Sequence, residues 1–83
     1  MKILVTGGYG FIGSNLIRKL LQNEIFEIYN IDKLSYASNK DSIADLINLN
    51  NQERYQFFKL DLINYKELCE VINLIKPDLV MHL

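Results

Sequence analysis

A glycine-rich turn near the start of the chain most constrains the fold. Residues 6–13 read Thr-Gly-Gly-Tyr-Gly-Phe-Ile-Gly, between a short apolar run and a segment with helical spacing. A strand, a glycine turn and a helix in this order can bind phosphate, because the main chain approaches an anion closely and the first helix N–H groups point at it. We expect Gly7 to permit the turn, Gly10 to admit a pyrophosphate against the main chain, and Gly13 to let the helix pack closely on the strand.

Apolar residues alternate between strand-like runs and helical stripes along the rest of the chain. The pattern predicts strands at 1–6, 25–31, 54–60 and 79–83, and helices at 11–23, 41–49 and 64–76. Asn64 and Glu67 have the spacing of a capping box at the start of the last helix, and Pro77 ends that helix.

Alternating strands and helices give a parallel sheet with right-handed crossovers. We therefore expect an α/β fold, the N-terminal part of a Rossmann-type doubly wound fold with strand order 3-2-1-4. The ligand crevice should lie where this order reverses, between the first and fourth strands. With 83 residues the chain forms one domain at most, which we expect to be truncated in its fourth strand.

Two acidic residues follow neighbouring strands. Asp32 ends the second strand 19 positions after Gly13, and Asp61 ends the third strand at the same edge of the sheet. A carboxylate at the first position accepts hydrogen bonds from the ribose hydroxyls of an adenosine and repels a 2′-phosphate. The sequence therefore favours NAD over NADP as the cofactor, and we interpret the neighbouring Lys33 as a solvated loop residue.

Charge and composition narrow the classes of partner. The formal net charge is −1 and the basic residues are scattered, so we expect neither nucleic acid nor an anionic membrane surface as a partner. No apolar run is long enough for a signal peptide or a membrane span, and a single cysteine, Cys69, allows no internal disulfide. We expect a cytoplasmic location, and no residues have the spacing of metal ligands.

The spacing Gly7-x-x-Gly10-x-x-Gly13, preceded by Thr6, resembles the extended short-chain dehydrogenase/reductase superfamily, in its NAD-dependent epimerase/dehydratase family. Within that family the local sequences are similar to the dTDP-glucose 4,6-dehydratases, and this resemblance runs the whole length of the chain. Residues 32–37, Asp-Lys-Leu-Ser-Tyr-Ala, are its most specific part. The other stretches that carry the resemblance are 1–8, 53–55, 76–78 and 80–83.

The resemblance implies a role for each part of the site. The residues after the glycine turn would lie along the pyrophosphate, those after the second strand would hold the adenosine ribose, and those after the third would contact adenine. Leu83 would open the segment under the nicotinamide. The implied cofactor-binding residues are Gly7, Gly10, Phe11, Ile12, Gly13, Asp32, Lys33, Leu34, Ser35, Asp61, Leu62 and Leu83. This chain departs from the family at Ser35, Ser38 and Leu62, where threonine, glycine and isoleucine are usual.

The family reaction implies catalytic residues outside these 83 positions. In that reaction NAD⁺ takes a hydride from C4 of the sugar, water leaves across C5 and C6, and the hydride returns to C6. It needs a tyrosine with a lysine four residues later and an acid pair, which in the family follow the segment present here. Tyr29 with Lys33, and Tyr36 with Lys40, match the spacing but belong to the adenosine end.

We therefore expect no catalytic residue here, and an inactive fragment that lacks the substrate domain. The full-length protein would bind a nucleotide-sugar substrate and form a homodimer.

Two other functions remain open. One is another enzyme of the same superfamily, chiefly a UDP-sugar 4-epimerase or a related decarboxylase. The other is a non-catalytic NAD-binding protein, which would lack the downstream tyrosine–lysine pair. His82, the single histidine, lies in an apolar strand near the expected crevice, and we interpret it as a structural residue.

Overall fold

A computed structural model describes residues 1–34 and 52–83 of the chain. The elements are β1 (Lys2–Thr6), α1 (Phe11–Leu20), β2 (Glu27–Asp32), the short 3₁₀ helix η2 (Gln52–Arg54), β3 (Tyr55–Lys59), α2 (Tyr65–Ile75) and β4 (Leu79–His82). The helix predicted at 41–49 lies outside the described residues, as do Ser35 and Ser38.

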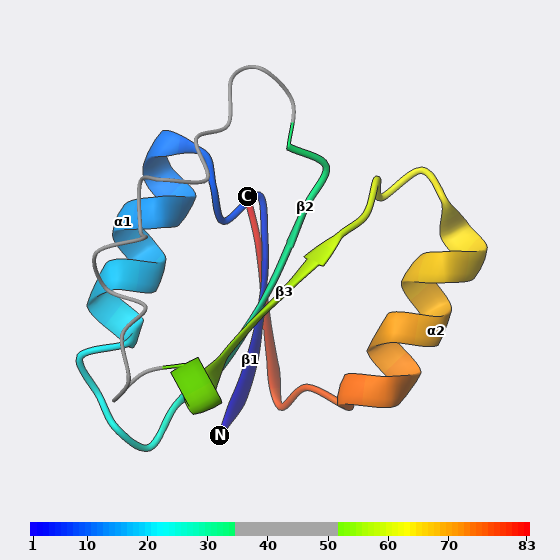
Figure 1. The fold of residues 1–83 in the computed structure, drawn as a ribbon. Coiled ribbons are helices and arrows are strands. Elements are labelled where there is room, and N and C mark those ends of the chain that lie inside the picture. The colour runs from blue at the N-terminus through cyan, green and yellow to red at the C-terminus, as the bar shows by residue number, and fades with distance from the viewer. Residues whose placement is uncertain (35–51) are drawn as a thin grey trace.

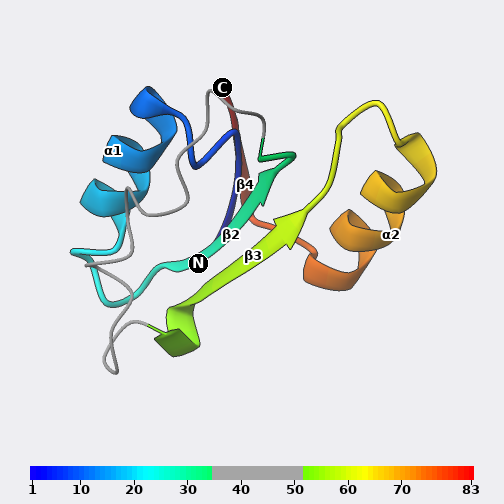
Figure 2. The same ribbon diagram turned by 45° about the horizontal axis from the view of Figure 1, so that its top comes forward.

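The four strands form one parallel sheet in the order β3-β2-β1-β4, which confirms the predicted topology. Ile3 of β1 pairs with Ile28 of β2 on one side and with Leu79 of β4 on the other. Of the described α-helices, α1 lies on one face of the sheet and α2 on the other (Figure 1). Figure 2 shows the strands between α1 and α2, with the glycine turn joining β1 to α1. The reversal of strand order therefore falls between β1 and β4.

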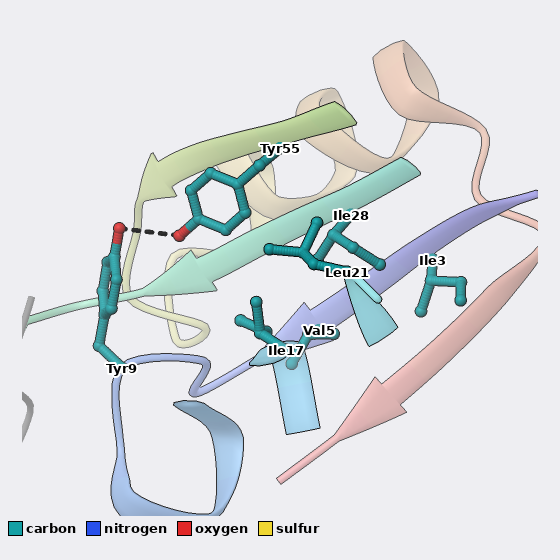
Figure 3. Packing of buried hydrophobic residues seen from close by; sticks show 7 residues of the cluster. All are labelled: Ile3, Val5, Tyr9, Ile17, Leu21, Ile28 and Tyr55. Carbon is teal, nitrogen blue, oxygen red and sulfur yellow. Dashed lines mark hydrogen bonds between the residues drawn. The ribbon is translucent and has the colours of Figure 1, made fainter. Parts of the chain in front are cut away.

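The helices create two separate cores, which explains the uninterrupted apolar run of β1. Successive strand side chains point to opposite faces, and here both faces are covered. On the α1 side the buried cluster is Ile3, Val5, Tyr9, Ile17, Leu21, Ile28 and Tyr55 (Figure 3). On the α2 side it is Leu4, Ile31, Leu60 and Ile75.

Several predicted boundaries were too wide. Helix α1 ends at Leu20 rather than at residue 23, because the chain turns there: the Asn23 N–H donates to the Leu20 carbonyl three residues back. The Asn23 side chain then accepts from the Ile25 N–H, so β2 begins only at Glu27. The strands β1, β3 and β4 each differ from the prediction by one residue at one or both ends, where ladder pairing stops.

Identifiable residues determine where α2 begins and where it ends. The Asn64 side chain accepts a hydrogen bond from the Glu67 N–H at 3.4 Å, which confirms the asparagine half of the predicted capping box. At the other end Lys76 adopts a left-handed φ of 53°, directly before Pro77. Asp78 then exchanges two 2.8 Å hydrogen bonds with the main chain of Lys2, which aligns β4 beside β1.

Candidate functional site

A pocket of about 290 Å³ opens at the carboxyl edge of the sheet. It is lined by Thr6, Gly7, Gly10, Asp32, Lys33, Asp61, Leu62 and Leu83. These residues come from the ends of all four strands and from the glycine turn, where open parallel sheets bind their ligands. Every lining residue except Thr6 belongs to the set predicted from the sequence.

The glycine turn has the geometry that its sequence predicts. Gly7 has a φ of +73°, a left-handed conformation that favours glycine. A Cβ atom on Gly13 would lie 2.1 Å from the Gly7 carbonyl oxygen, so only glycine allows α1 to pack this closely on the turn. Around Gly10, in contrast, a Cβ would meet only that same oxygen, at 3.4 Å, and its face is open to the pocket.

The amide N–H groups of the turn are used inside the protein. The acceptors for residues 7, 8, 9 and 10 are the Ile31 carbonyl (2.8 Å), Asn30 Oδ1 (2.9 Å), Asp32 Oδ2 (2.9 Å) and the Gly7 carbonyl (3.1 Å). The turn itself therefore offers no amide to a ligand.

The first turn of α1 does offer such donors. The first N–H group of the helix that has an acceptor is that of Ser14, which donates to the Gly10 carbonyl at 2.9 Å. The N–H groups of Phe11, Ile12 and Gly13 have no partner within residues 1–34 and 52–83, and no side chain caps this helix. These amides, at the positive end of the helix dipole, are therefore available to an anion.

Phe11 and Ile12 contribute to the site through their main chain. Their side chains are 85% and 70% exposed, and neither lines the pocket. The sequence-based prediction of a role along a pyrophosphate is thus compatible with the amides of these residues and not with their side chains.

Asp32 is buried to 5% exposure at the floor of the pocket. Its Oδ2 accepts from the Tyr9 N–H at 2.9 Å, and its Oδ1 accepts from the Leu34 N–H at 2.8 Å. Leu34 itself has a left-handed φ of 57°, a conformation that costs energy for residues other than glycine. The carboxylate is therefore held by two main-chain N–H groups, one on each oxygen.

The other predicted ribose residues lie in different places. Lys33 lines the pocket, whereas the Leu34 side chain packs on the α1-side core. Ser35 lies outside the described residues. Across the pocket, Asp61 accepts from the Ile63 N–H at 3.1 Å, and Leu62 supplies an apolar wall that packs on the α2-side core.

Thr6 joins the ends of β1 and β4 at the pocket. Its Oγ1 lies 2.7 Å from Nδ1 of His82 and accepts from the Leu83 N–H at 3.1 Å. The first contact gives His82 a hydrogen-bond partner inside the fold, and its interpretation as a structural residue stays a prediction. The second bond holds Leu83 at the pocket wall. Thr6 was part of the sequence motif but was not in the predicted site.

Sequence reasoning also missed a buried polar residue behind the turn. Asn30, in the middle of β2, is fully buried, and its Oδ1 accepts from the Gly8 N–H. A Cβ on Gly8 would lie 2.1 Å from that same oxygen, so the turn lies directly on the Asn30 side chain. The one available signal was a polar side chain between the apolar neighbours Tyr29 and Ile31 of the strand.

Residues 1–34 and 52–83 contain neither a membrane-spanning helix nor a cluster of metal ligands. No helix there is long and apolar enough to cross a membrane. No group of three or more histidine, cysteine, aspartate or glutamate side chains there could hold a metal ion.

The reversed strand order, the helix N-terminus beside it and the acids at the strand ends define a Rossmann-type fold. The chain belongs to the GDP-mannose 4,6-dehydratase family, whose model matches residues 4–83.

The curated relatives confirm the resemblance seen in the sequence. The chain is 43% identical over 83 residues to dTDP-glucose 4,6-dehydratase 1 of Escherichia coli, and 44% identical over 81 residues to the dTDP-glucose 4,6-dehydratase of Neisseria gonorrhoeae. These alignments cover 100% and 98% of this chain but 22% of each relative. The chain therefore spans about a fifth of the length of the curated relatives that it matches.

Solved structures confirm the fold class. A dTDP-glucose 4,6-dehydratase from Bacillus anthracis, solved in complex with NAD, superposes with a TM-score of 0.88 at 36% identity. That match covers 99% of this chain and 26% of the other. The UDP-Glc/GlcNAc 4-epimerase from Campylobacter jejuni has a TM-score of 0.85 at 33% identity, covering 99% of this chain and 23% of that enzyme.

Proposed function

We propose that this chain binds NAD in the pocket at the ends of the strands, as the N-terminal part of the cofactor domain of a nucleotide-sugar dehydratase. One juxtaposition carries the proposal: the unpartnered amides of Phe11 and Ile12 lie at the same sheet edge as the fixed carboxylate of Asp32. The amides suit a pyrophosphate and the carboxylate suits a ribose. The similar Bacillus anthracis dehydratase was solved with NAD.

The residues that line the pocket offer a contact for each part of the proposed cofactor. The open face of Gly10 lets the pyrophosphate lie against the main chain, and Asp61 with Leu62 offers adenine one polar and one apolar contact. Leu83 also lines the pocket, and we propose that the nicotinamide passes beside it. NAD would supply a hydride acceptor for oxidation of the sugar, and the residues described here would bind and orient it.

Asp32 supports NAD over NADP. A 2′-phosphate beside this carboxylate would place like charges together in a partly desolvated pocket, which is unfavourable. Lys33 also lines the pocket, but it lies on the exposed side of it.

The proposed substrate is dTDP-glucose, converted to its 4-keto-6-deoxy product. The relatives named as dTDP-glucose 4,6-dehydratases support this proposal, and a similar dehydratase from Streptomyces venezuelae was solved with NAD and TYD bound. We expect no turnover from these 83 residues alone, because the tyrosine–lysine pair that the family reaction needs is expected outside them. Dimer formation, a cytoplasmic location, and the absence of nucleic-acid and membrane partners stay predictions.

A UDP-sugar 4-epimerase is the second candidate, since epimerase structures resemble this fold nearly as well. An assay on the polypeptide at its natural length separates the two functions. We expect formation of the 4-keto-6-deoxy sugar from dTDP-glucose. Interconversion of UDP-glucose and UDP-galactose without that product would show an epimerase instead.

The binding step is tested by Asp32→Asn, with Glu70→Gln on the exposed surface of α2 as the matched control. Loss of a charge-assisted hydrogen bond should weaken the binding of NAD by roughly tenfold to a hundredfold, and should weaken the binding of NADP much less. Isothermal titration with both cofactors gives the two dissociation constants. Equal losses in both variants would contradict a specific role for Asp32.

A further inference from the structure

A chain of buried polar side chains connects the glycine turn to β3. Asn30 Nδ2 donates to the Tyr55 hydroxyl at 3.1 Å. The Tyr55 hydroxyl in turn donates to the Tyr9 hydroxyl at 2.8 Å, a bond that Figure 3 shows. All three side chains are less than 9% exposed. No buried side-chain polar atom of the described residues lacks a partner, so the chain of hydrogen bonds is satisfied throughout.

Tyr9 reaches two different parts of the protein. Its ring packs edge-to-face against Phe57, with ring centroids 4.8 Å apart and an interplanar angle of 64°. Its hydroxyl is bonded to Tyr55 at the start of β3, 46 positions along the chain. Its main-chain N–H donates to Asp32, inside the pocket. The side chain of Tyr9 thus anchors on β3 the same peptide group that holds the Asp32 carboxylate.

The hydroxyl network persists over the ordinary pH range. Burial raises the pKa of Tyr9, and the charge of Asp32 raises it further, although the hydrogen bond from Tyr55 opposes both. The pKa of Tyr55 is also raised, mainly by burial. Both phenols therefore stay neutral near pH 7, and the donor hydrogen between them remains in place.

We propose that Tyr9 is a specificity-determining positioning residue, which enforces the preference for NAD over NADP by preventing the Asp32 carboxylate from turning away from a 2′-phosphate. This proposal rests on the proposed function. A carboxylate excludes a phosphate only while it stays in place, and rotation here would break its bond to the Tyr9 N–H. The discrimination is the difference between the binding free energies of NAD and NADP. Because repulsion by the Asp32 carboxylate raises only that of NADP, the discrimination depends on how firmly this carboxylate is held.

The test uses the polypeptide at its natural length and four forms of it: unmodified, Tyr9→Phe, Tyr55→Phe and Tyr29→Phe. The first two substitutions each delete one oxygen of the network and preserve the ring. Tyr29 is the control, because it lies beside Asn30 in the same strand but packs on the α2 side of the sheet. Titration with NAD and with NADP gives a ratio of dissociation constants for each form.

We expect Tyr9→Phe and Tyr55→Phe to weaken NAD binding by about threefold to tenfold and to reduce the NAD-to-NADP discrimination by about tenfold, in line with one lost buried hydrogen bond. Tyr29→Phe should leave the discrimination ratio within about twofold of the unmodified protein. Because Tyr9 and Tyr55 act through one bond, the double variant should lose little more discrimination than either single variant.

Two outcomes would overturn the proposal. If Tyr9→Phe and Tyr55→Phe lower the melting temperature but preserve the ratio, the network serves the fold alone. If the unmodified polypeptide binds NAD and NADP equally well or binds neither, the proposed NAD preference fails, and the role of Tyr9 fails with it. The first outcome leaves NAD binding intact, so failure of the inference is distinguishable from failure of the proposed function.

Discussion

At the scale of single residues, different glycines of the turn serve folding and ligand binding. A methyl group on Gly10 would meet little, and the residue has an ordinary φ of −74°. A methyl group on Gly13 would collide with the Gly7 carbonyl at 2.1 Å. The two positions thus share a motif but differ in what a side chain would disturb.

We predict opposite consequences for the two alanine substitutions. Gly10→Ala should change the free energy of unfolding by less than about 1 kcal/mol. It should nevertheless weaken the binding of NAD at least about tenfold, because the methyl group takes the place of the pyrophosphate. Gly13→Ala should destabilise the fold by about 3 kcal/mol through overpacking. Urea denaturation and NAD titration measure both quantities. Normal NAD affinity in Gly10→Ala would contradict the assigned path of the pyrophosphate.

The buried phenols predict a pH dependence of stability. In the unfolded chain Tyr9 and Tyr55 ionise near their ordinary pKa of 10.0, whereas in the fold their pKa is raised. Their contribution to stability is therefore complete below pH 10 and is lost as the pH rises above it, by up to about 1.4 kcal/mol per pH unit for each phenol. Urea midpoints measured from pH 8 to 11 should fall less steeply for Tyr9→Phe/Tyr55→Phe, and parallel curves would contradict this account.

At the scale of elements, Arg54 connects two segments that are distant in sequence. Its guanidinium donates to the carbonyl oxygens of Leu21, Asn23 and Phe26, at 3.1, 3.0 and 3.2 Å. These carbonyls lie between the end of α1 and the start of β2. Arg54 thus fixes the start of β3 to the same connection that determines where α1 ends.

Arg54→Met keeps the aliphatic stem and removes these hydrogen bonds, so it should lower the free energy of unfolding by about 1–3 kcal/mol. Lys59→Met, at the exposed end of β3, is the control and should have an effect below about 0.5 kcal/mol. Urea denaturation compares the two variants. A similar loss in both would mean that the carbonyl contacts add nothing specific.

The described helices and strands could be predicted from the sequence because each carries a local pattern of apolar residues. Their ends depend on particular contacts, as at Asn23, whose hydrogen bonds end α1 and delay β2. The role of Arg54 shows the same limit. No local pattern indicates that a side chain 31 positions after Asn23 returns to its carbonyl.

At the scale of the whole molecule, the strand order and the position of the pocket could be predicted from the sequence, because strands and helices alternate along it and the glycine motif has a typical spacing. The network behind the pocket did not, because it joins Asn30 to Tyr55 across 25 positions and Tyr55 to Tyr9 across 46. The sequence motif also predicted that the first helix N–H groups face the anion, but it did not indicate that every amide of the glycine turn already has an acceptor inside the protein. Only the folded arrangement shows which amides are already used.

The central claim is tested most directly by a crystal structure of the natural-length polypeptide with NAD. We predict pyrophosphate oxygens within about 3.2 Å of the Phe11 and Ile12 nitrogen atoms, and adenosine ribose hydroxyls on Asp32. A cofactor in the second pocket, of about 310 Å³ beside Tyr29 and Leu74, would contradict the account. So would a pyrophosphate bound with no contact to these two amides.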